Sequence, residues 1–368
     1  MTRAAVCFGS PSPEHDISIL TGLQATQALL PGPFDVVALY WAKTGAWYQV
    51  PSQSEASDFA EGIPRGAIPV QLVTGPDGGF HAEGRRGRRT LMGIDGIVNC
   101  CHGVPGEDGT LQALFDLAGL RYTGPSQWGA ALGMDKLAFA GAMQAAGVPT
   151  PPTVVVNDTL ESVSFEPPFI VKPRFGGSSI GIEVVDDLGT AKALARSQPL
   201  LQDGAVMQPY LQGAVDLNVC VRTHPARQLS AVERPLRGAD GRIYTYAEKY
   251  LQGGEGMASA PREMPADIPT PIEADLRTYA SRVMDIAMVR SVARIDFLWS
   301  GDEILVNEIN TIPGALGWYF WSYEGIPFGQ LLTEMLAEAE LGPTRRFRTQ
   351  GADGVALRSA GSIASKLA

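Results

Sequence analysis

The sequence lacks long apolar runs and has only four cysteines. No apolar stretch in the 368 residues approaches the roughly 18 that a membrane-spanning helix needs. Residues 1–12 contain one basic residue and a short apolar run that predicts a strand, so we do not expect a secretory signal. The cysteines lie in apolar, strand-like runs, unlike a disulfide framework: Cys7, Cys100, Cys101 and Cys220. These features favour a reducing cytoplasm.

Basic residues are scarce relative to acidic ones. The chain has 29 Lys and Arg residues against 39 Asp and Glu residues, which gives a formal net charge of -10. This balance argues against nucleic acid or an anionic membrane as a partner. Any bound phosphate must therefore be held by local groups, yet neither the P-loop pattern GxxxxGK[ST] nor the dinucleotide pattern GxGxxG occurs.

The first third of the chain alternates strand and helix patterns. Apolar runs at 4–8, 35–40 and 94–101 predict strands, and the spacing of residues 17–30 and 111–120 predicts helices. Such alternation predicts an α/β fold with a parallel sheet flanked by helices, whose ligands bind beyond the carboxyl ends of the strands. The length predicts two or three domains, and 45% hydrophobic residues suffice for a core in each.

Beyond residue 126 the patterns continue without an internal repeat. Helices are predicted at 127–146, where Gly147 and a proline-rich segment end the helix, and at 272–287 and 328–341. A glycine-rich polar stretch covers 237–256, and a polar tail begins at Pro343. Strands are predicted at 153–156, 169–172, 182–185, 206–211, 217–221, 292–299 and 303–310.

A glycine- and serine-rich loop joins two of these strands. Residues 176–181 lie between the strand that ends at Lys172 and the strand at 182–185. A loop between two strands is a flap, whereas the phosphate loops of P-loop and dinucleotide folds lead into helices. Glycines let backbone amides approach phosphates closely, and Lys172 supplies positive charge. The alternative is an ordinary glycine-rich hairpin.

Four polar side chains are predicted to meet on the last two strands. Strand alternation places Arg294 and Asp296 on one face, and likewise Glu308 and Asn310. A three-residue connection at 301–303 would put Asp296 opposite Glu308 and Arg294 opposite Asn310. Two carboxylates and an amide oxygen suit Mg²⁺, which also takes ligands from substrate phosphates. The alternative is an exposed, salt-bridged sheet face.

Two further polar motifs follow predicted strands. Glu14 and His15 come after the first strand, where they either line a site or begin a helix, and His15 is expected to be structural. Asp108 either caps the helix that follows or lies in a ligand-lining loop, and His102 could meet a substrate carboxylate.

The run Cys100-Cys101-His102 could suggest a metal site. Adjacent residues on a strand point to opposite faces, and no second Cys/His pair follows at ligand spacing. We therefore expect buried packing.

In this order, the motifs resemble those of the D-alanine–D-alanine ligase family of the ATP-grasp type. The resemblance runs from about residue 4 to about residue 341 and rests on Glu14-His15, residues 102–110, Met134-Asp135-Lys136, Lys172-Pro173, Gly177-Ser178-Ser179, Lys249-Tyr250, Arg294, Asp296, Glu308 and Asn310. It implies a three-domain ATP-grasp fold with ATP held between the central and C-terminal domains. The expected boundaries are 1–124, 125–208 and 209–345, followed by a polar tail at 346–368.

The resemblance also implies roles for these residues. The expected ATP contacts are Lys136, Lys172, Gly177, Ser178, Ser179, Gln208, Leu211, Asp216 and Lys249. Two magnesium ions, for which manganese could substitute, would be held by Asp296, Glu308 and Asn310. The expected amino-acid contacts are Glu14, His102, Arg294, Gly314 and Tyr319, and a Glu14–Ser178–Tyr250 network would close a loop over the site.

A ligase of this kind transfers the γ-phosphoryl group of ATP to one amino acid, and the amine of a second attacks the acyl phosphate. Lys249 would approach the transferred phosphate, while Arg294 and the Gly314 N–H would stabilise the tetrahedral intermediate. Tyr250 matches the ligases that make D-alanyl-D-alanine for peptidoglycan and not the vancomycin-resistance ligases that make D-alanyl-D-lactate. The family also suggests a homodimer.

The sequence departs from the family pattern on the adenine side. Gln208 stands where the family usually has an acidic residue. Asp216 fits the expected ribose-binding acid only with a one-residue insertion.

A second departure concerns the acceptor. The usual Pro-Gly-x-Thr-x-x-Ser becomes Pro-Gly-Ala-Leu-Gly-Trp-Tyr at 313–319, so Tyr319 replaces the serine that meets the second substrate's carboxylate. We expect Tyr319 to present its phenol there; the alternative is that it turns away and leaves Trp318 and Phe320 lining the pocket. The alternative functions are a ligase with a different acceptor and a nucleotide-binding protein without ligase activity.

Overall fold

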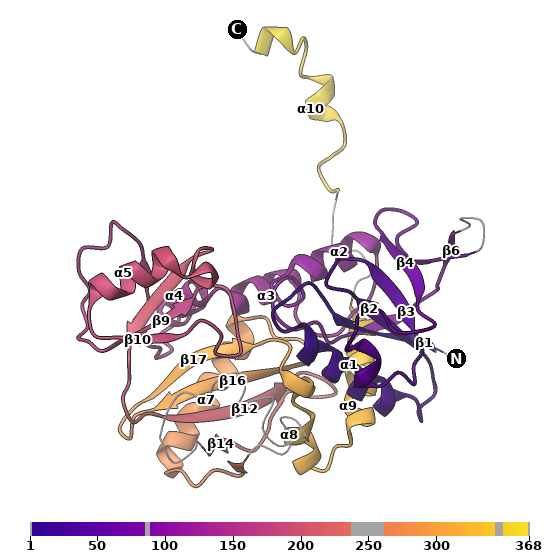
Figure 1. The fold of residues 1–368 in the computed structure, drawn as a ribbon. Helices are drawn as coiled ribbons and strands as arrows, with labels where there is room; N and C mark the ends of the chain where they lie inside the picture. Colours follow the sequence, from indigo (N-terminus) through magenta and orange to yellow (C-terminus); the bar gives the residue numbers. More distant parts are fainter. Residues whose placement is uncertain (1, 85–88, 237–260, 343–348, 367–368) are drawn as a thin grey trace.

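The computed structural model describes residues 2–84, 89–236, 261–342 and 349–366. Within these ranges the chain forms three sheets and a two-stranded ribbon, arranged in three lobes, while the short helix α10 (Val355–Arg358) lies away from the rest (Figure 1). No helix in the described ranges is both long and apolar enough to cross a membrane.

The N-terminal sheet is mixed. Strand β1 pairs in parallel with β2 and β7, which confirms the predicted parallel arrangement in this part of the sheet. Four antiparallel strands that were not predicted extend it from β2 outward. In spatial order the strands are β6 (Arg89–Leu91), β5 (Gly79–Glu83), β4 (Ile68–Val73), β3 (Trp47–Val50), β2 (Phe34–Trp41), β1 (Thr2–Gly9) and β7 (Gly96–Asn99).

Side-chain alternation along β1 builds a core on each face of this sheet. Ala4, Val6 and Phe8 belong to the cluster that includes α1 and α9, whereas Ala5 and Cys7 belong to the cluster that includes α2. The late helix α9 therefore returns to the first sheet and ties the two ends of the fold together (Figure 1). These helices are α1 (His15–Leu29), α2 (Thr110–Ala118) and α9 (Phe328–Leu341).

The predicted helix at 127–146 is wrong in one respect, because it is two helices. Residues Gln127–Met134 form α3 and Lys136–Ala145 form α4. Asp135 between them is extended, and its carboxylate accepts the N–H groups of the first turn of α4. It also pairs with Arg174 through two hydrogen bonds of 2.7 and 2.5 Å. The break sets Lys136 beside the loop that follows β9.

The central sheet carries the predicted flap. Its strands are, in order, β10 (Glu183–Val185), β9 (Phe169–Pro173), β11 (Ala205–Pro209) and β8 (Val154–Val156), and α5 (Leu188–Ser197) packs on it. Strands β9 and β10 are antiparallel neighbours, so the loop at 176–181 joins two paired strands, as predicted.

The C-terminal sheet has a buried face and a face that carries polar groups. Its strands are, in order, β13 (Gln228–Leu229), β12 (Val215–Arg222), β16 (Val292–Trp299) and β17 (Ile304–Asn310). Alternate residues of β12 and β16 pack against α7 (Thr270–Ile286), which turns the residues between them to the opposite face. The ribbon of β14 (Arg234–Pro235) and β15 (Arg262–Glu263) adjoins β12.

The remaining described elements are short. They are η1 (Ala56–Phe59), η3 (Pro199–Leu201), η5 (Gly314–Gly317), α8 (Trp318–Tyr323) and η6 (Ala364–Lys366). The four cysteines are buried and free, and Cys100 and Cys101 lie in opposite cores, which confirms the predicted packing.

Candidate functional site

One cavity of about 280 Å³ brings the predicted site residues together. Lys249 and Tyr250 lie outside the described residues. Every other predicted site residue lines this cavity: Glu14, His102, Lys136, Lys172, Gly177, Ser178, Ser179, Gln208, Leu211, Asp216, Arg294, Asp296, Glu308, Asn310, Gly314 and Tyr319.

The predicted pairing of the last two strands is confirmed. Asp296 lies opposite Glu308, and Arg294 lies opposite Asn310. The alternate residues of β16 are buried against α7, so strand alternation turns the four polar groups to the cavity face. Asn218 on β12 lies opposite Asp296 and joins the same face.

The connection between these strands differs from the predicted one. The last pair joins Trp299 to Ile304, so the connection contains four residues, 300–303, and not three. A β-bulge next to Asp296 restores the predicted pairing, and Asn307 is its extra residue. The bulge brings Asn307 to the cavity as well, where its Oδ1 accepts a hydrogen bond from Lys172 Nζ at 3.3 Å.

Asp296 accepts hydrogen bonds from Arg294 and Asn310. Arg294 donates to both of its carboxylate oxygens at 2.6 and 2.7 Å, and Asn310 Nδ2 donates at 3.0 Å. The Asp296 and Arg294 side chains are 13% and 15% exposed, so this pair lies largely out of water. Carboxylate and amide oxygens are donors of the kind that a divalent cation prefers, although among the residues that the structure describes no group of three or more His, Cys, Asp or Glu is placed to hold one.

Two lysines reach the cavity from either side of the flap. Lys136 Nζ donates to the Gly176 carbonyl, which ties α4 to the flap. Lys172 is buried, and its desolvation lowers its pKa from 10.5 to about 8 against the opposing charge of Glu308. Ser178 and Ser179 have φ values of 54° and 57°, a left-handed backbone that is uncommon for residues other than glycine and that clusters at ligand sites.

Glu14 closes the cavity from the N-terminal sheet. It precedes α1, and its Oε1 accepts a hydrogen bond from Ser178 Oγ, which confirms that part of the predicted network. Gly103 has a φ of 67°, and a side chain there would place Cβ only 2.6 Å from Glu14 Oε2. The left-handed backbone at this position and the close approach of the Glu14 carboxylate both favour glycine.

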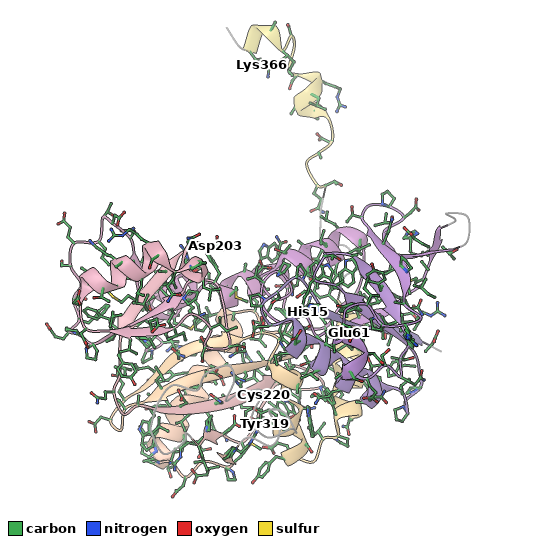
Figure 2. The ribbon with its side chains drawn as sticks, viewed as in Figure 1. His15, Glu61, Asp203, Cys220, Tyr319 and Lys366 are labelled. Atoms are coloured by element: carbon green, nitrogen blue, oxygen red, sulfur yellow. The ribbon has the colours of Figure 1, made fainter. Side chains whose placement is uncertain are left out.

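His15 is structural, as predicted. Its Nδ1 lies 2.5 Å from the Ser10 carbonyl and its Nε2 lies 3.1 Å from the Tyr40 hydroxyl (Figure 2 labels His15).

The contact of His102 with a substrate carboxylate stays a prediction, and within the chain both of its ring nitrogens have partners. Its Nδ1 donates to the Ile312 carbonyl at 2.9 Å, which requires Nε2 to accept from the Thr21 hydroxyl at 2.9 Å. Burial lowers the pKa of His102 from 6.5 to about 4, so the ring is neutral. Thr21 Oγ1 in turn accepts from the Ala315 N–H at 3.2 Å, so His102 positions the loop that carries Gly314.

Glu107 holds the same loop from the other side. Its Oε1 accepts from the Ile312 N–H at 2.7 Å and from the Thr311 hydroxyl at 3.3 Å. Burial raises its pKa from 4.5 to about 8, and the nearby charge of Glu14 adds to the shift.

The alternative expected for Tyr319 is wrong, because Tyr319 lines the cavity and Trp318 and Phe320 do not. Its ring lines the cavity, but its hydroxyl donates to Glu233 Oε2 at 3.3 Å, and the ring lies beside Cys220 in one hydrophobic cluster (Figure 2). Phe320 is fully buried, and Trp318 stacks on Phe328 with ring centroids 5.9 Å apart. The phenol hydroxyl is therefore engaged with a neighbouring carboxylate, and its contact with the acceptor stays a prediction.

The adenine-side residues are present but altered. Gln208 is buried, and its Nε2 donates to the Thr153 hydroxyl at 2.9 Å, so an amide takes the place of the family's usual acid. Asp216 and Leu211 line the cavity together with the apolar Ile170 and Leu298.

The cavity residues that were not assigned a role from the sequence include Glu107, Asn218, Glu233, Arg262 and Asn307. A polar residue inside the apolar strand at 217–221 was a usable signal for Asn218. Arg262 follows a polar stretch with no periodic pattern, so the sequence held no signal for it.

Comparison with known proteins identifies related chains over almost the whole length. Residues 3–125 match the family described as D-ala D-ala ligase N-terminus, and residues 130–337 match D-ala D-ala ligase C-terminus. The D-alanine–D-alanine ligase of Bifidobacterium animalis subsp. lactis is 30% identical over 92% of this chain and 99% of its own length. That of Mycolicibacterium smegmatis is 31% identical over 92% and 95%.

Solved structures share the fold. The D-alanine-D-alanine ligase from Coxiella burnetii superimposes with a TM-score of 0.74 at 20% identity and covers 99% of both chains. The VanG D-Ala:D-Ser ligase from Enterococcus faecalis gives a TM-score of 0.74 at 22% identity, covering 92% of this chain and 99% of its own. The three-domain ATP-grasp fold expected from the sequence is confirmed.

Proposed function

We propose that this chain, which belongs to the D-alanine–D-alanine ligase family of ATP-dependent carboxylate–amine ligases, joins two D-alanine molecules for peptidoglycan synthesis. The main support for the proposal is the strand register that sets Asp296 opposite Glu308. Both residues line the same cavity as the flap, Lys136 and Lys172. Phosphoryl transfer needs this combination of metal-binding oxygens, cations and backbone donors.

Asp296, Glu308 and Asn310 would hold magnesium. When bound there, magnesium would polarise the phosphoryl oxygens of ATP and offset their charge. Lys136 and Lys172 add positive charge beside the phosphates, and the Gly177–Ser179 flap supplies N–H and hydroxyl donors. Lys249, outside the described residues, would approach the transferred phosphoryl group.

The donor amino acid lies between Glu14 and Arg294 in this proposal. Glu14 would pair with the ammonium group of this amino acid. The carboxylate of the amino acid would face the γ-phosphate of ATP, which is the group transferred. The second amine then attacks the acyl carbon, while Arg294 and the Gly314 N–H bind the oxyanion and the phosphate leaves. His102 and Glu107 bind the backbone of Ile312 and so hold the loop that carries Gly314 in place.

The product should be an amide. With ATP, Mg²⁺ and D-alanine, we expect ADP release matched by a product of the mass of D-alanyl-D-alanine, and D-lactate should be a poorer acceptor than D-alanine near neutral pH. L-alanine serves as the stereochemical control. ATP hydrolysis without ligation of any amino acid would contradict the proposed function. A preference for D-lactate would contradict only the prediction that the product is an amide.

Ser178→Ala should uncouple ATP use from ligation. Removing a hydrogen bond to a charged group typically costs about 1.5 to 3 kcal/mol, so kcat/KM for ligation should fall about 10- to 100-fold. Water then gains access to the acyl phosphate, and the ratio of ADP to dipeptide should rise. Because Ser178 donates to Glu14, the effects of Ser178→Ala and Glu14→Gln should not add in the double variant. Additive effects would show that this contact does not matter for closure.

We also propose the domain boundaries expected from the sequence, a homodimer and a cytoplasmic location. Support comes from the family resemblance and from four free, buried cysteines. Light scattering that gives the monomer mass would contradict the dimer.

A further inference from the structure

Gln208 projects into the cavity from the central sheet. Met207, its neighbour on β11, packs in the apolar cluster that includes α5, so strand alternation turns Gln208 to the opposite face of the sheet. Ile170 on β9 pairs directly with Gln208 and shares that face, and both residues line the cavity. Lys172 lies two positions beyond Ile170 on the same strand and therefore faces the same way. The Gln208 side chain is thus on the same sheet face as the lysine that we place beside the phosphates.

Thr153, directly before β8, holds the Gln208 amide. The pairing of β8 with β11 ends at Val154 and Met207. One position further, Thr153 and Gln208 are opposite each other, and Gln208 Nε2 donates to Thr153 Oγ1 at 2.9 Å. Thr153 Oγ1 in turn donates to the Pro151 carbonyl at 2.9 Å. A hydroxyl has one hydrogen and a carbonyl can only accept, so the Thr153 oxygen is left to accept from Gln208, which fixes Nε2 as the amide atom beside it.

These contacts decide which end of the amide faces the cavity. An amide side chain has a donor end and an acceptor end of nearly the same shape, so its partners set its orientation. With Nε2 held by Thr153, the acceptor Oε1 is the remaining end of Gln208. Within the described ranges Oε1 has no hydrogen-bond partner, yet it is not one of the solvent-inaccessible atoms that lack one. Oε1 is therefore open to the cavity that Gln208 lines.

The orientation matters because this chain has an amide where the family usually has an acid. Both oxygens of a carboxylate accept hydrogen bonds, so turning an acid changes nothing, whereas turning Gln208 replaces an acceptor by a donor. Adenine carries an amino group, a donor, at the position where guanine and hypoxanthine carry a carbonyl oxygen, an acceptor. An acceptor that faces the base therefore pairs with the amino group and opposes the carbonyl.

We propose that Thr153 is a positioning residue that gives this chain its base selectivity. Tied to the Pro151 carbonyl, it holds Gln208 with Oε1 towards the cavity, and the ligand class is a nucleoside triphosphate whose base carries a 6-amino group. The inference rests on the proposed ligase function, because it takes the cavity as the nucleotide site. A 6-oxo base would leave two acceptors facing each other without a hydrogen between them, and such unpaired groups are what make a polar site selective.

The test compares ATP with ITP, whose base carries a 6-oxo group in place of the amino group, as substrates for the ligation of D-alanine. The wild type should prefer ATP in kcat/KM. Thr153→Val keeps the branched shape and removes the hydroxyl, so the amide can turn and donate to the ITP carbonyl, and the ATP preference should fall about 10-fold. The change should lie in KM and not in kcat, because the base is remote from the transferred phosphoryl group. Thr153→Ser keeps the hydroxyl and should retain the wild-type preference.

A second background separates the orientation of the amide from damage to the fold. In Gln208→Glu both side-chain oxygens accept, so adding Thr153→Val should leave the ATP preference unchanged. An equal fall in both backgrounds would show that Thr153 acts through the fold and would overturn the inference, as would an unaltered preference in folded Thr153→Val. A wild type that ligates D-alanine equally well with ATP and ITP would also overturn it and leave the ligase function standing. A wild type that ligates D-alanine with neither nucleotide would overturn both.

Discussion

Glu308→Gln should lower the rate of ADP release by about three orders of magnitude and leave the fold intact. The substitution keeps the side-chain volume and removes one negative charge from the pair that faces the cavity. Without that carboxylate, the charge that builds up on the transferring phosphoryl group loses its compensation. ADP release and the thermal midpoint, measured on the same preparation, separate catalysis from folding.

The matched control for this prediction is Glu303→Gln. Glu303 lies in the connection between the same two strands and is exposed, so the same chemical change should have no effect on turnover. If Glu308→Gln turned over at the wild-type rate at every magnesium concentration tested, the proposed metal site would be wrong. A rise in the magnesium concentration needed for half-maximal rate would support it.

Asp296→Asn is a less clean test of the proposed metal site than Glu308→Gln. Asp296 receives two hydrogen bonds from Arg294, and both side chains are largely buried. Removing one partner of a buried ion pair leaves an uncompensated charge and typically costs about 3 to 5 kcal/mol. We therefore expect this variant to lose both activity and stability.

Strand alternation was enough to predict which polar groups share a face, because a period of two holds wherever one face is buried. The opposition of Asp296 and Glu308 was predicted from a three-residue connection, whereas the chain uses a four-residue connection and a bulge at Asn307. The extra residue in the connection and the extra residue in the bulge offset each other, so the predicted register is correct at Asp296. The alternation of polar and apolar residues does not indicate turn length or bulges, because both depend on local packing.

Asp135 shows how a long-range contact accompanies a helix interruption that the sequence pattern did not predict. Its carboxylate caps α4 and also pairs with Arg174, 39 positions further along the chain. Tyr319 is a similar case. Its orientation is determined by Glu233 and Arg262, which are distant in sequence, so a substitution in the acceptor motif could be recognised but its consequence could not be predicted.

A second large effect should appear in the pH dependence of stability, where His102 and Glu107 act in opposite directions. The pKa of Glu107 is about 8 in the folded chain against an ordinary 4.5, so the folded state keeps a proton that the unfolded state loses. The contribution of Glu107 to the free energy of unfolding is fully present below pH 4.5 and is lost as the pH rises to 8. For a fully buried group this amounts to roughly 5 kcal/mol.

His102 has the opposite sign. Its folded pKa is about 4 against an ordinary 6.5, so its contribution is full above pH 6.5 and is lost as the pH falls to 4. Burial is the main cause in both residues, while Glu14 adds to the shift of Glu107 and Arg294 adds to that of His102. Between pH 4.5 and 6.5 the two slopes cancel, because unfolding releases one proton and takes up another.

Single substitutions should separate the two opposing pH dependences of the free energy of unfolding. Chemical unfolding of Glu107→Gln should show a free energy of unfolding that rises, relative to the wild type, by roughly 1.4 kcal/mol per pH unit as the pH increases between 4.5 and 8. His102→Gln should show the reverse, a fall relative to the wild type between pH 4 and 6.5. Using differences from the wild type removes groups common to all chains, including His15, whose pKa is also lowered by burial. Parallel curves for all three proteins would mean that these two residues do not titrate as the structure requires, and that the loop carrying Gly314 is not held by a neutral pair.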